Sequence, residues 1–183
     1  MKPNLYSILV LALIGITGFS TSLRAASAYE LQRDGKRALR QLYENNSKAA
    51  EIANQASAVL IFPNIVKAGF IFGAQGGEGV LLINGEPAGY YQTSAVSYGL
   101  QAGVQKFGYA LFFMNHHALA YLHKSDGWEI GVGPSVVIVD SGVAKTMSST
   151  TLQGDIYAFI FSQKGLMAGL GLQGTKITQI YPD

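Results

Sequence analysis

Cysteine is absent from all 183 residues of the sequence. This absence excludes disulfides, thiol catalysis and zinc fingers, and it removes the residue that carries the lipid in lipid-anchored bacterial proteins. Histidine is scarce too, with three residues, and the spacing of His116, His117 and His123 matches no recognised set of metal ligands. We therefore expect neither a metal nor a cofactor.

The usual motifs of catalysis are also missing. Asp140-Ser141-Gly142 comes nearest to a nucleophile elbow, but it lacks the Gly-x-Ser-x-Gly frame. The carboxylates of Glu78, Glu86 and Asp155 are scattered among predicted turns, where solvation accounts for them. The sequence thus predicts a protein that is not an enzyme, with a hydrolase dependent on Ser141 as the alternative.

The N-terminus has the pattern of an export signal. Lys2 precedes an apolar run from Leu5 to Phe19, which is shorter than the roughly 18 residues of a spanning helix, and Ala26-Ser27-Ala28 has the small-x-small form of a cleavage site. We predict a signal peptide over residues 1–28 and a periplasmic or secreted protein. An uncleaved N-terminal anchor is the alternative.

The predicted mature chain has no net charge. Removing residues 1–28 takes away Lys2 and Arg24, which leaves 11 of the 13 basic residues against 11 acidic ones. A global basic field that would attract nucleic acid is therefore missing, and a charged partner must be bound by a local patch. The remaining length suits one domain with a hydrophobic core.

Residues 29–56 form a predicted helical segment. Glu30 to Glu44 is amphipathic, with one apolar stripe and an opposite face that is basic. Lys48 to Gln55 is a second, shorter helix after the turn-forming Asn45-Asn46-Ser47. The stripe consists of Leu31, Gly35, Ala38, Leu39 and Leu42, and the basic face of Arg33, Lys36, Arg37 and Arg40.

The basic face has two interpretations. A helix with an apolar stripe and a cationic face can bind an anionic lipid surface. Alternatively, Asp34 pairs with Arg37 and Arg40 with Glu44, so that the face is an ordinary solvated one and the stripe packs on the rest of the protein.

From Ser57 onward the sequence is typical of β structure, because β-branched and aromatic residues alternate with frequent glycine. Asn84-Gly85 and Asp126-Gly127 predict tight hairpin turns. Val96 to Val104 alternates strictly, which predicts one buried face with Val96, Tyr98, Leu100, Ala102 and Val104. The other predicted strands are 59–62, 66–72, 80–83, 90–93, 109–114, 130–132, 136–139, 156–161 and 166–172.

We predict an α+β fold in which short N-terminal helices pack on a curved, mostly antiparallel β-sheet or barrel, with residues 29–56 and 57–183 in one globular unit. Repeated glycine permits the bends that a curled sheet needs. An outer-membrane barrel is the competing interpretation, but the strands lack its period of roughly 10 residues. The cluster Gly73, Gly76, Gly77 and Gly79 is not a dinucleotide fingerprint, because a strand pattern and not a helix follows it.

Several segments in order resemble the SYLF-domain family. They are Ala58-Val59-Leu60-Ile61-Phe62-Pro63, Val66-Lys67-Ala68-Gly69-Phe70, Gly73 with Gly76-Gly77-Glu78-Gly79, Tyr98-Gly99-Leu100-Gln101-Ala102-Gly103, Gly131-Val132-Gly133-Pro134-Ser135, Gln163-Lys164-Gly165-Leu166 and Leu170 to Gly174. The resemblance covers roughly Ser57 to Asp183.

The resemblance implies lipid binding, because eukaryotic SYLF proteins bind phosphoinositides, partly through a basic N-terminal helix, and it implies no enzyme activity. Some of these relatives also bind actin, which is not an expected partner here. We expect an anionic phospholipid or membrane surface of the cell envelope as the partner, bound by Arg33, Lys36, Arg37, Arg40 and Lys67. The alternative is a structural module that binds an envelope protein.

Overall fold

A computed structural model describes residues 25–123, 127–139, 152–165, 172 and 174–183. Most of the predicted signal peptide, all of Asp140-Ser141-Gly142 and nearly all of the predicted strand 166–172 lie outside these residues.

Two helices open the described part of the chain. Helix α2 (Ala28–Asn45) begins with a capping box, in which the Ser27 hydroxyl accepts from the Glu30 amide and the Glu30 carboxylate accepts from the Ser27 amide. Asn46 ends α2 and caps α3 (Ser47–Ala53) through its side chain. The predicted apolar stripe is buried along its whole length, so the amphipathic helix is confirmed.

The sheet is built around one long hairpin. Strand β1 (Ala58–Ile83) and strand β2 (Glu86–Phe113) pair antiparallel along their length and are joined by the predicted Asn84-Gly85 turn, where both residues have positive φ. The later elements are α4 (His116–His123), β3 (Trp128–Glu129), β4 (Val136–Ile138), β5 (Ile156–Gly165) and β6 (Lys176–Ile180).

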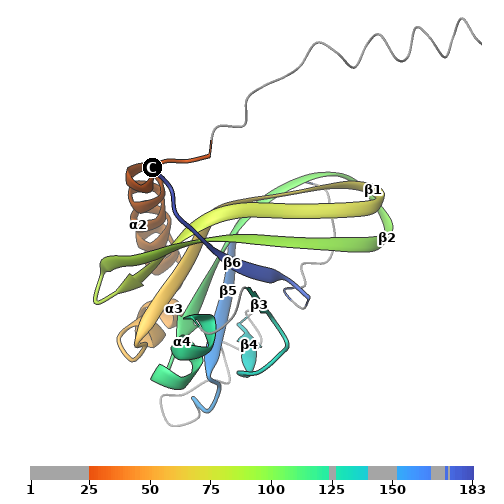
Figure 1. Cartoon of the computed structure of the whole chain (residues 1–183). Helices are drawn as coiled ribbons and strands as arrows, with labels where there is room; N and C mark the ends of the chain where they lie inside the picture. Colours follow the sequence, from red (N-terminus) through yellow and green to blue (C-terminus); the bar gives the residue numbers. More distant parts are fainter. Residues whose placement is uncertain (1–24, 124–126, 140–151, 166–171, 173) are drawn as a thin grey trace, which may run out of the picture.

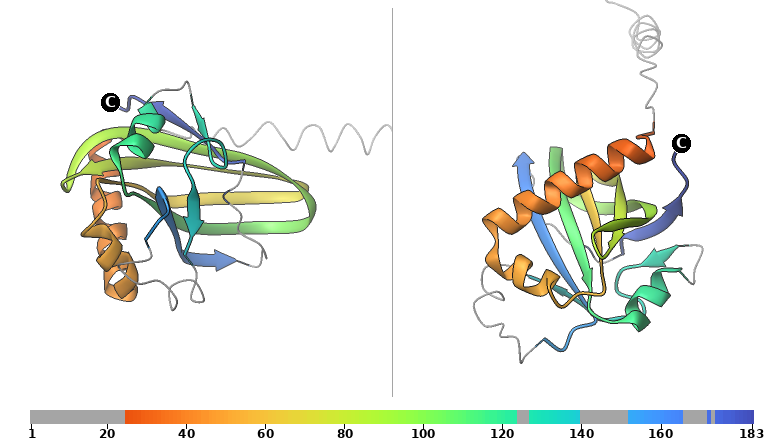
Figure 2. Two further views of the ribbon diagram at one scale, coloured as in Figure 1. Left: turned by 90° about the horizontal axis from the view of Figure 1, so that it is seen from below. Right: turned by 90° about the vertical axis from the view of Figure 1, so that its left-hand side faces the viewer.

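The other strands attach to the free edge of β2. Its first part pairs with β6 and its last part with β5, both antiparallel, while the short β4 adds to β5 in parallel and β3 adds to β6. The described strands form one six-stranded sheet, curled into a half-barrel with α2 and α3 on its outside (Figures 1 and 2). The predicted α+β fold with a curved, mostly antiparallel sheet is confirmed.

Both long strands double back halfway along. The register of the β1–β2 pairing shifts between Phe70 and Phe72, and at this point the ribbon turns back on itself, far from the helices (Figures 1 and 2). The two halves of β1 then cross at glycines: a Cβ on Gly77 would lie 2.4 Å from the Asn64 carbonyl oxygen, and one on Gly79 would lie 2.3 Å from that of Ile61. The glycine cluster therefore serves backbone approach within the sheet.

The sheet buries apolar side chains on both faces. One cluster fills the inside of the half-barrel, with Phe62, Tyr109, Phe113 and Trp128 among its largest members. The other joins α2 and α3 to the outer face. Both clusters and the helix cap lie within residues 25–183, so we expect this part of the chain to fold without the first 24 residues.

Three sequence predictions need correction. Val96, Tyr98 and Val104 are exposed and not buried, because this part of the hairpin extends beyond the elements that cover the rest of the sheet. Residues 130–132 form a turn, since Gly131 and Gly133 adopt positive φ. Helix α4 and strand β6 are elements that the sequence patterns did not predict.

Candidate functional site

The predicted basic face of α2 points to solvent. Its four cationic side chains lie on the exposed side of the helix, and the opposite stripe, including Ala38, Leu39 and Leu42, packs on the outer face of the sheet. Because that stripe is already buried, the helix in this position cannot also offer it to an acyl chain. The basic face consists of Arg33, Lys36, Arg37 and Arg40.

Three of these four cations have acidic neighbours. Arg33 Nε lies 2.9 Å and Arg37 Nη2 lies 3.0 Å from Asp34 Oδ1, and this contact raises the pKa of the Arg33 guanidinium. Lys36 Nζ lies 3.8 Å from Glu86 Oε2 at the start of β2. All of these pairs are exposed, so each is worth little energy, but they reduce the positive charge that the helix presents.

Lys67 does not belong to this surface. Its side chain is only 8% exposed and lies on the inner face of the doubled hairpin, where its register partner is Gln105. The Gln105 Oε1 atom is also buried and has no hydrogen-bond partner among the described residues. Lys67 is therefore part of a polar interior, separated from the other four residues predicted to bind lipid.

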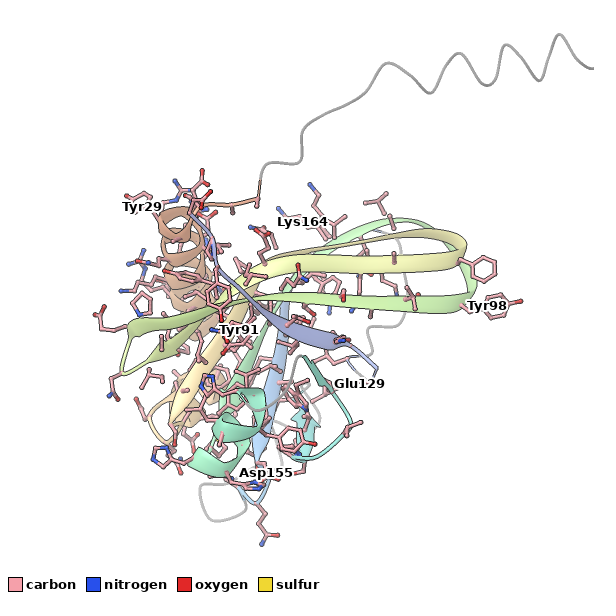
Figure 3. All side chains as sticks on the ribbon, viewed as in Figure 1. Tyr29, Tyr91, Tyr98, Glu129, Asp155 and Lys164 are labelled. Atoms are coloured by element: carbon pink, nitrogen blue, oxygen red, sulfur yellow. The ribbon has the colours of Figure 1, made fainter. Side chains whose placement is uncertain are left out.

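A pocket of about 240 Å³ lies between α2, β2 and β5, and we call it the basic pocket. It contains one cation of the helix, Arg37, and two lysines from neighbouring strands, Lys106 and Lys164. Figure 3 shows Lys164 beside the middle of the hairpin. The pocket is lined by Asp34, Arg37, Ala38, Gln41, Pro63, Asn64, Lys106, Phe107, Phe161, Ser162 and Lys164.

The two lysines of the basic pocket are direct register partners. Like charges facing each other across two strands repel and destabilise a sheet, and an anion bound between them would offset this repulsion. The pocket contains one carboxylate, Asp34, which is already engaged with Arg37. In the described part of the chain neither Lys106 nor Lys164 forms an ion pair, so the pocket presents uncompensated positive charge.

The backbone beside these lysines is strained. Ser162 has φ of 54°, a left-handed conformation that is rare for a residue other than glycine, and the β2–β5 register shifts between Lys106 and Gly108. Such bulges redirect side chains and recur next to functional sites. Here the bulge lies on the wall of the basic pocket, directly beside the Lys106–Lys164 pair.

Lys106 and Lys164 were not among the site residues predicted from the sequence. A signal for them was present, because residues 87–125 and 156–182 contain no acidic residue at all. Lysines in such stretches have no local carboxylate to pair with. Their convergence on Arg37, however, depends on strand register and cannot be read from local spacing.

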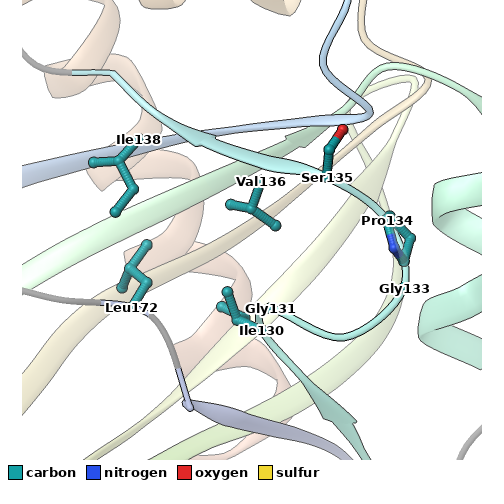
Figure 4. Close-up of a pocket in the computed structure, with 8 residues that line it drawn as sticks. All are labelled: Ile130, Gly131, Gly133, Pro134, Ser135, Val136, Ile138 and Leu172. Atoms are coloured by element: carbon teal, nitrogen blue, oxygen red, sulfur yellow. The ribbon is translucent and has the colours of Figure 1, made fainter.

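A second pocket, of about 420 Å³, is mostly apolar (Figure 4). Its one hydroxyl side chain, that of Ser135, donates to the Asp155 carboxylate at 2.8 Å. The pocket offers no charged group that would select a ligand. It is lined by Ile130, Gly131, Gly133, Pro134, Ser135, Val136, Ile138 and Leu172.

No group of three or more potential metal ligands occurs among the described residues. His116 begins α4 and His123 ends it, where the His123 Nδ1 atom lies 3.1 Å from the Tyr91 hydroxyl. Burial raises the pKa of Tyr91, and that of Tyr43, to about 12, so both phenols stay neutral at physiological pH. Within the described ranges, no helix is both long and apolar enough to span a bilayer.

Residues 94–181 match the family described as Ysc84, a Las17-binding protein actin regulator. The match includes both lysines of the basic pocket, all of β5, and β2 from Ser94 onward. A search of curated proteins found no match.

The family match indicates a lipid- or protein-interaction module. More narrowly, the chain carries a SYLF domain over residues 94–181, and the family predicted from the sequence is confirmed.

Proposed function

We propose that this protein is an exported, non-enzymatic module that binds anionic lipid surfaces of the cell envelope. In this proposal the basic pocket receives an acidic headgroup, and the exposed cations of α2 add attraction over a wider area. The proposed location is the periplasm or the exterior of the cell.

One observation carries the proposal: Lys106 and Lys164 lie opposite each other in a polar pocket without a carboxylate of their own. A phosphate group accepts several charge-assisted hydrogen bonds and would relieve the repulsion between the two ammonium groups. Arg37, on the facing helix, adds a third cation to the same pocket.

Two further features support the proposal. The apolar run from Leu5 to Phe19 is typical of an export signal. Eukaryotic SYLF proteins bind lipid partly through a basic N-terminal helix, and α2 is similar in kind. The rival function is binding of an envelope protein, and the family's own description, which names Las17 binding and actin regulation, favours protein partners for its members.

The test compares two double variants of residues 25–183 by flotation with vesicles of neutral and of anionic phospholipid. Lys106→Gln with Lys164→Gln removes the unpaired charges of the pocket. The matched control, Lys36→Gln with Lys48→Gln, removes two lysines that already have acidic partners at 3.8 Å and 2.5 Å.

At about 1 kcal/mol per basic contact, the pocket variant should bind anionic vesicles roughly thirtyfold more weakly than the wild type. The control variant loses the same amount of positive charge. Its affinity should fall only a few-fold, because its two lysines already have acidic partners. Equal losses in the two variants would show that net charge alone governs binding, and this result would contradict a role for the pocket. If the wild type floats with neither vesicle, the lipid proposal fails and the protein-binding rival is favoured.

A further inference from the structure

The bend where the β1–β2 ribbon doubles back is covered with apolar side chains in contact with solvent. Phe72 is 72% exposed, Tyr98 is 77% exposed and Val96 is 89% exposed. The rings of Phe72 and Tyr98 pack on each other with centroids 5.0 Å apart, and Figure 3 shows Tyr98 at the far end of the ribbon. We call this surface the apolar bend, and it consists of Val66, Phe72, Val96, Tyr98 and Val104.

These side chains lie on both outer faces of the ribbon. Side chains alternate along a strand, and on β1 Lys67 and Gln75 point into the fold while Val66 and Phe72 point outward. A Cβ on Gly69 would lie 2.4 Å from the Gly73 Cα, so the inner faces of the two halves of β1 meet at the bend. Apolar side chains therefore lie on both sides of a projecting wedge. A bilayer can surround both sides, whereas a protein docked on the bend would cover only one.

The charge of the bend matches an anionic bilayer. Residues 64–77 and 92–106, which form this part of the ribbon, include two lysines and no acidic residue. Lys106 is exposed two positions from Val104 and is the register partner of Val66, so apolar and cationic side chains share one face. Aromatic and apolar side chains together with basic ones are typical of segments that enter the membrane–water interface.

Helix α2 cannot supply the apolar side chains that would enter a membrane. Attraction between cations and headgroups holds a protein at the surface, and insertion of apolar side chains adds binding that salt does not screen. The apolar stripe of α2 is buried against the sheet and cannot insert. Among the described residues, the apolar bend gathers exposed apolar side chains beside uncompensated lysines.

We propose that the apolar bend inserts end-on into the outer layer of an anionic phospholipid bilayer, with Phe72 and Tyr98 at its leading edge and Lys106 and Lys164 at the headgroups. This inference rests on the proposed lipid function and names the element that enters the membrane. A second copy of the chain is the other candidate to cover the bend, and the test separates the two.

Because the chain has no cysteine, one introduced cysteine carries one fluorophore that reports local polarity. Tyr98→Cys places the probe on the bend, and Gln153→Cys places a control probe at an exposed position near Asp155, away from the bend. Both labelled proteins, residues 25–183, are mixed with anionic vesicles, with and without a lipid-borne quencher in the acyl region. Emission at position 98 should shift to the blue and be quenched, while emission at position 153 should not change.

A second experiment measures affinity. Phe72→Ser with Tyr98→Ser should weaken binding to anionic vesicles roughly tenfold at low and high salt alike, because it removes apolar contact and no charge. The melting temperature should not fall, since both rings are exposed. Tyr29→Ser with Tyr181→Ser, which removes two other aromatic residues, 71% and 85% exposed, should leave the affinity unchanged.

Vesicle binding without quenching at position 98 would overturn the insertion but leave the proposed lipid function standing. Failure of the unlabelled protein to float with anionic vesicles would overturn both. A blue shift at position 98 that grows with protein concentration in the absence of lipid would show that a second copy covers the bend, and this too would overturn the insertion.

Discussion

Asp155 has a role at the scale of single residues that its sequence context did not indicate. The sequence placed it in a solvated turn, but its carboxylate accepts from the Ser135 amide and hydroxyl at 2.9 Å and 2.8 Å and from the Asn115 side chain at 2.9 Å. These hydrogen bonds, led by the one from the Ser135 amide, lower the pKa of Asp155 from its ordinary value of 3.8. One carboxylate thus connects the starts of α4, β4 and β5.

Replacing this carboxylate should make the free energy of unfolding depend less on pH in the acidic range. A pKa that is lower in the folded protein gives a stabilisation that is present above the ordinary value and is lost as the pH falls through the folded value. We expect Asp155→Asn to lower the free energy of unfolding by about 1 kcal/mol at pH 7, since the side chain is only partly buried and water can replace part of its hydrogen bonding. Urea unfolding from neutral to acidic pH measures this, and a gap between variant and wild type that stays constant down to the lowest pH would contradict it.

At the scale of the secondary-structure element, the crossing of β1 over itself depends on particular glycines. A Cβ on Gly79 would meet the Ile61 carbonyl oxygen at 2.3 Å and a Phe62 ring carbon at 2.7 Å, whereas a Cβ on Gly76 would meet only the Thr93 carbonyl oxygen at an ordinary 3.5 Å. The two glycines are three residues apart in one strand, and they differ mainly in the room that their neighbours leave for a Cβ atom.

We therefore expect Gly79→Ala to lower the free energy of unfolding by about 2–3 kcal/mol, because the backbones must separate to admit the methyl group. Gly76→Ala should be neutral or slightly stabilising, since alanine loses less backbone entropy on folding. Urea unfolding of the two variants beside the wild type makes the comparison. Equal effects would mean that close approach of the backbones is not what selects glycine at position 79.

The elements also differ in how well the sequence predicts them. Helix α2, its stripe and its basic face follow from local periodicity, and the Asn84-Gly85 turn follows from two residues, so both were predictable. The doubling back of β1 and β2 depends on contacts such as Gly79 with Ile61, which no short window includes. Alternation from Val96 to Val104 was correctly identified as a strand, but alternation does not show which face is covered.

The candidate site was predictable only in part, for the same reason. Arg33, Lys36, Arg37 and Arg40 share a helix face because they are close in sequence, and one of them, Arg37, lines the basic pocket. Lys106 and Lys164 are brought to that pocket by the pairing of β2 with β5. Lys67 was assigned to the site from the family resemblance, and strand alternation instead places it inside the ribbon.

At the scale of the whole molecule, the cations and the exposed apolar residues divide the surface into regions. The helices cover one end of the sheet with a partly paired basic face, the basic pocket opens between α2 and the strands, and the apolar bend projects from the other end. This arrangement of local patches on a body without net charge is what we expect of a module that binds at a surface.

The proposed binding of anionic lipid is measured by the affinity of residues 25–183 for vesicles as a function of salt concentration. Between about 0.01 M and 1 M salt the Debye length falls from about 30 Å to 3 Å, so an interaction that depends on cations must weaken. We expect binding to anionic vesicles that weakens steadily over this range, and little binding to neutral vesicles. Equal affinity for both lipids at every salt concentration, or no binding to either, would contradict it.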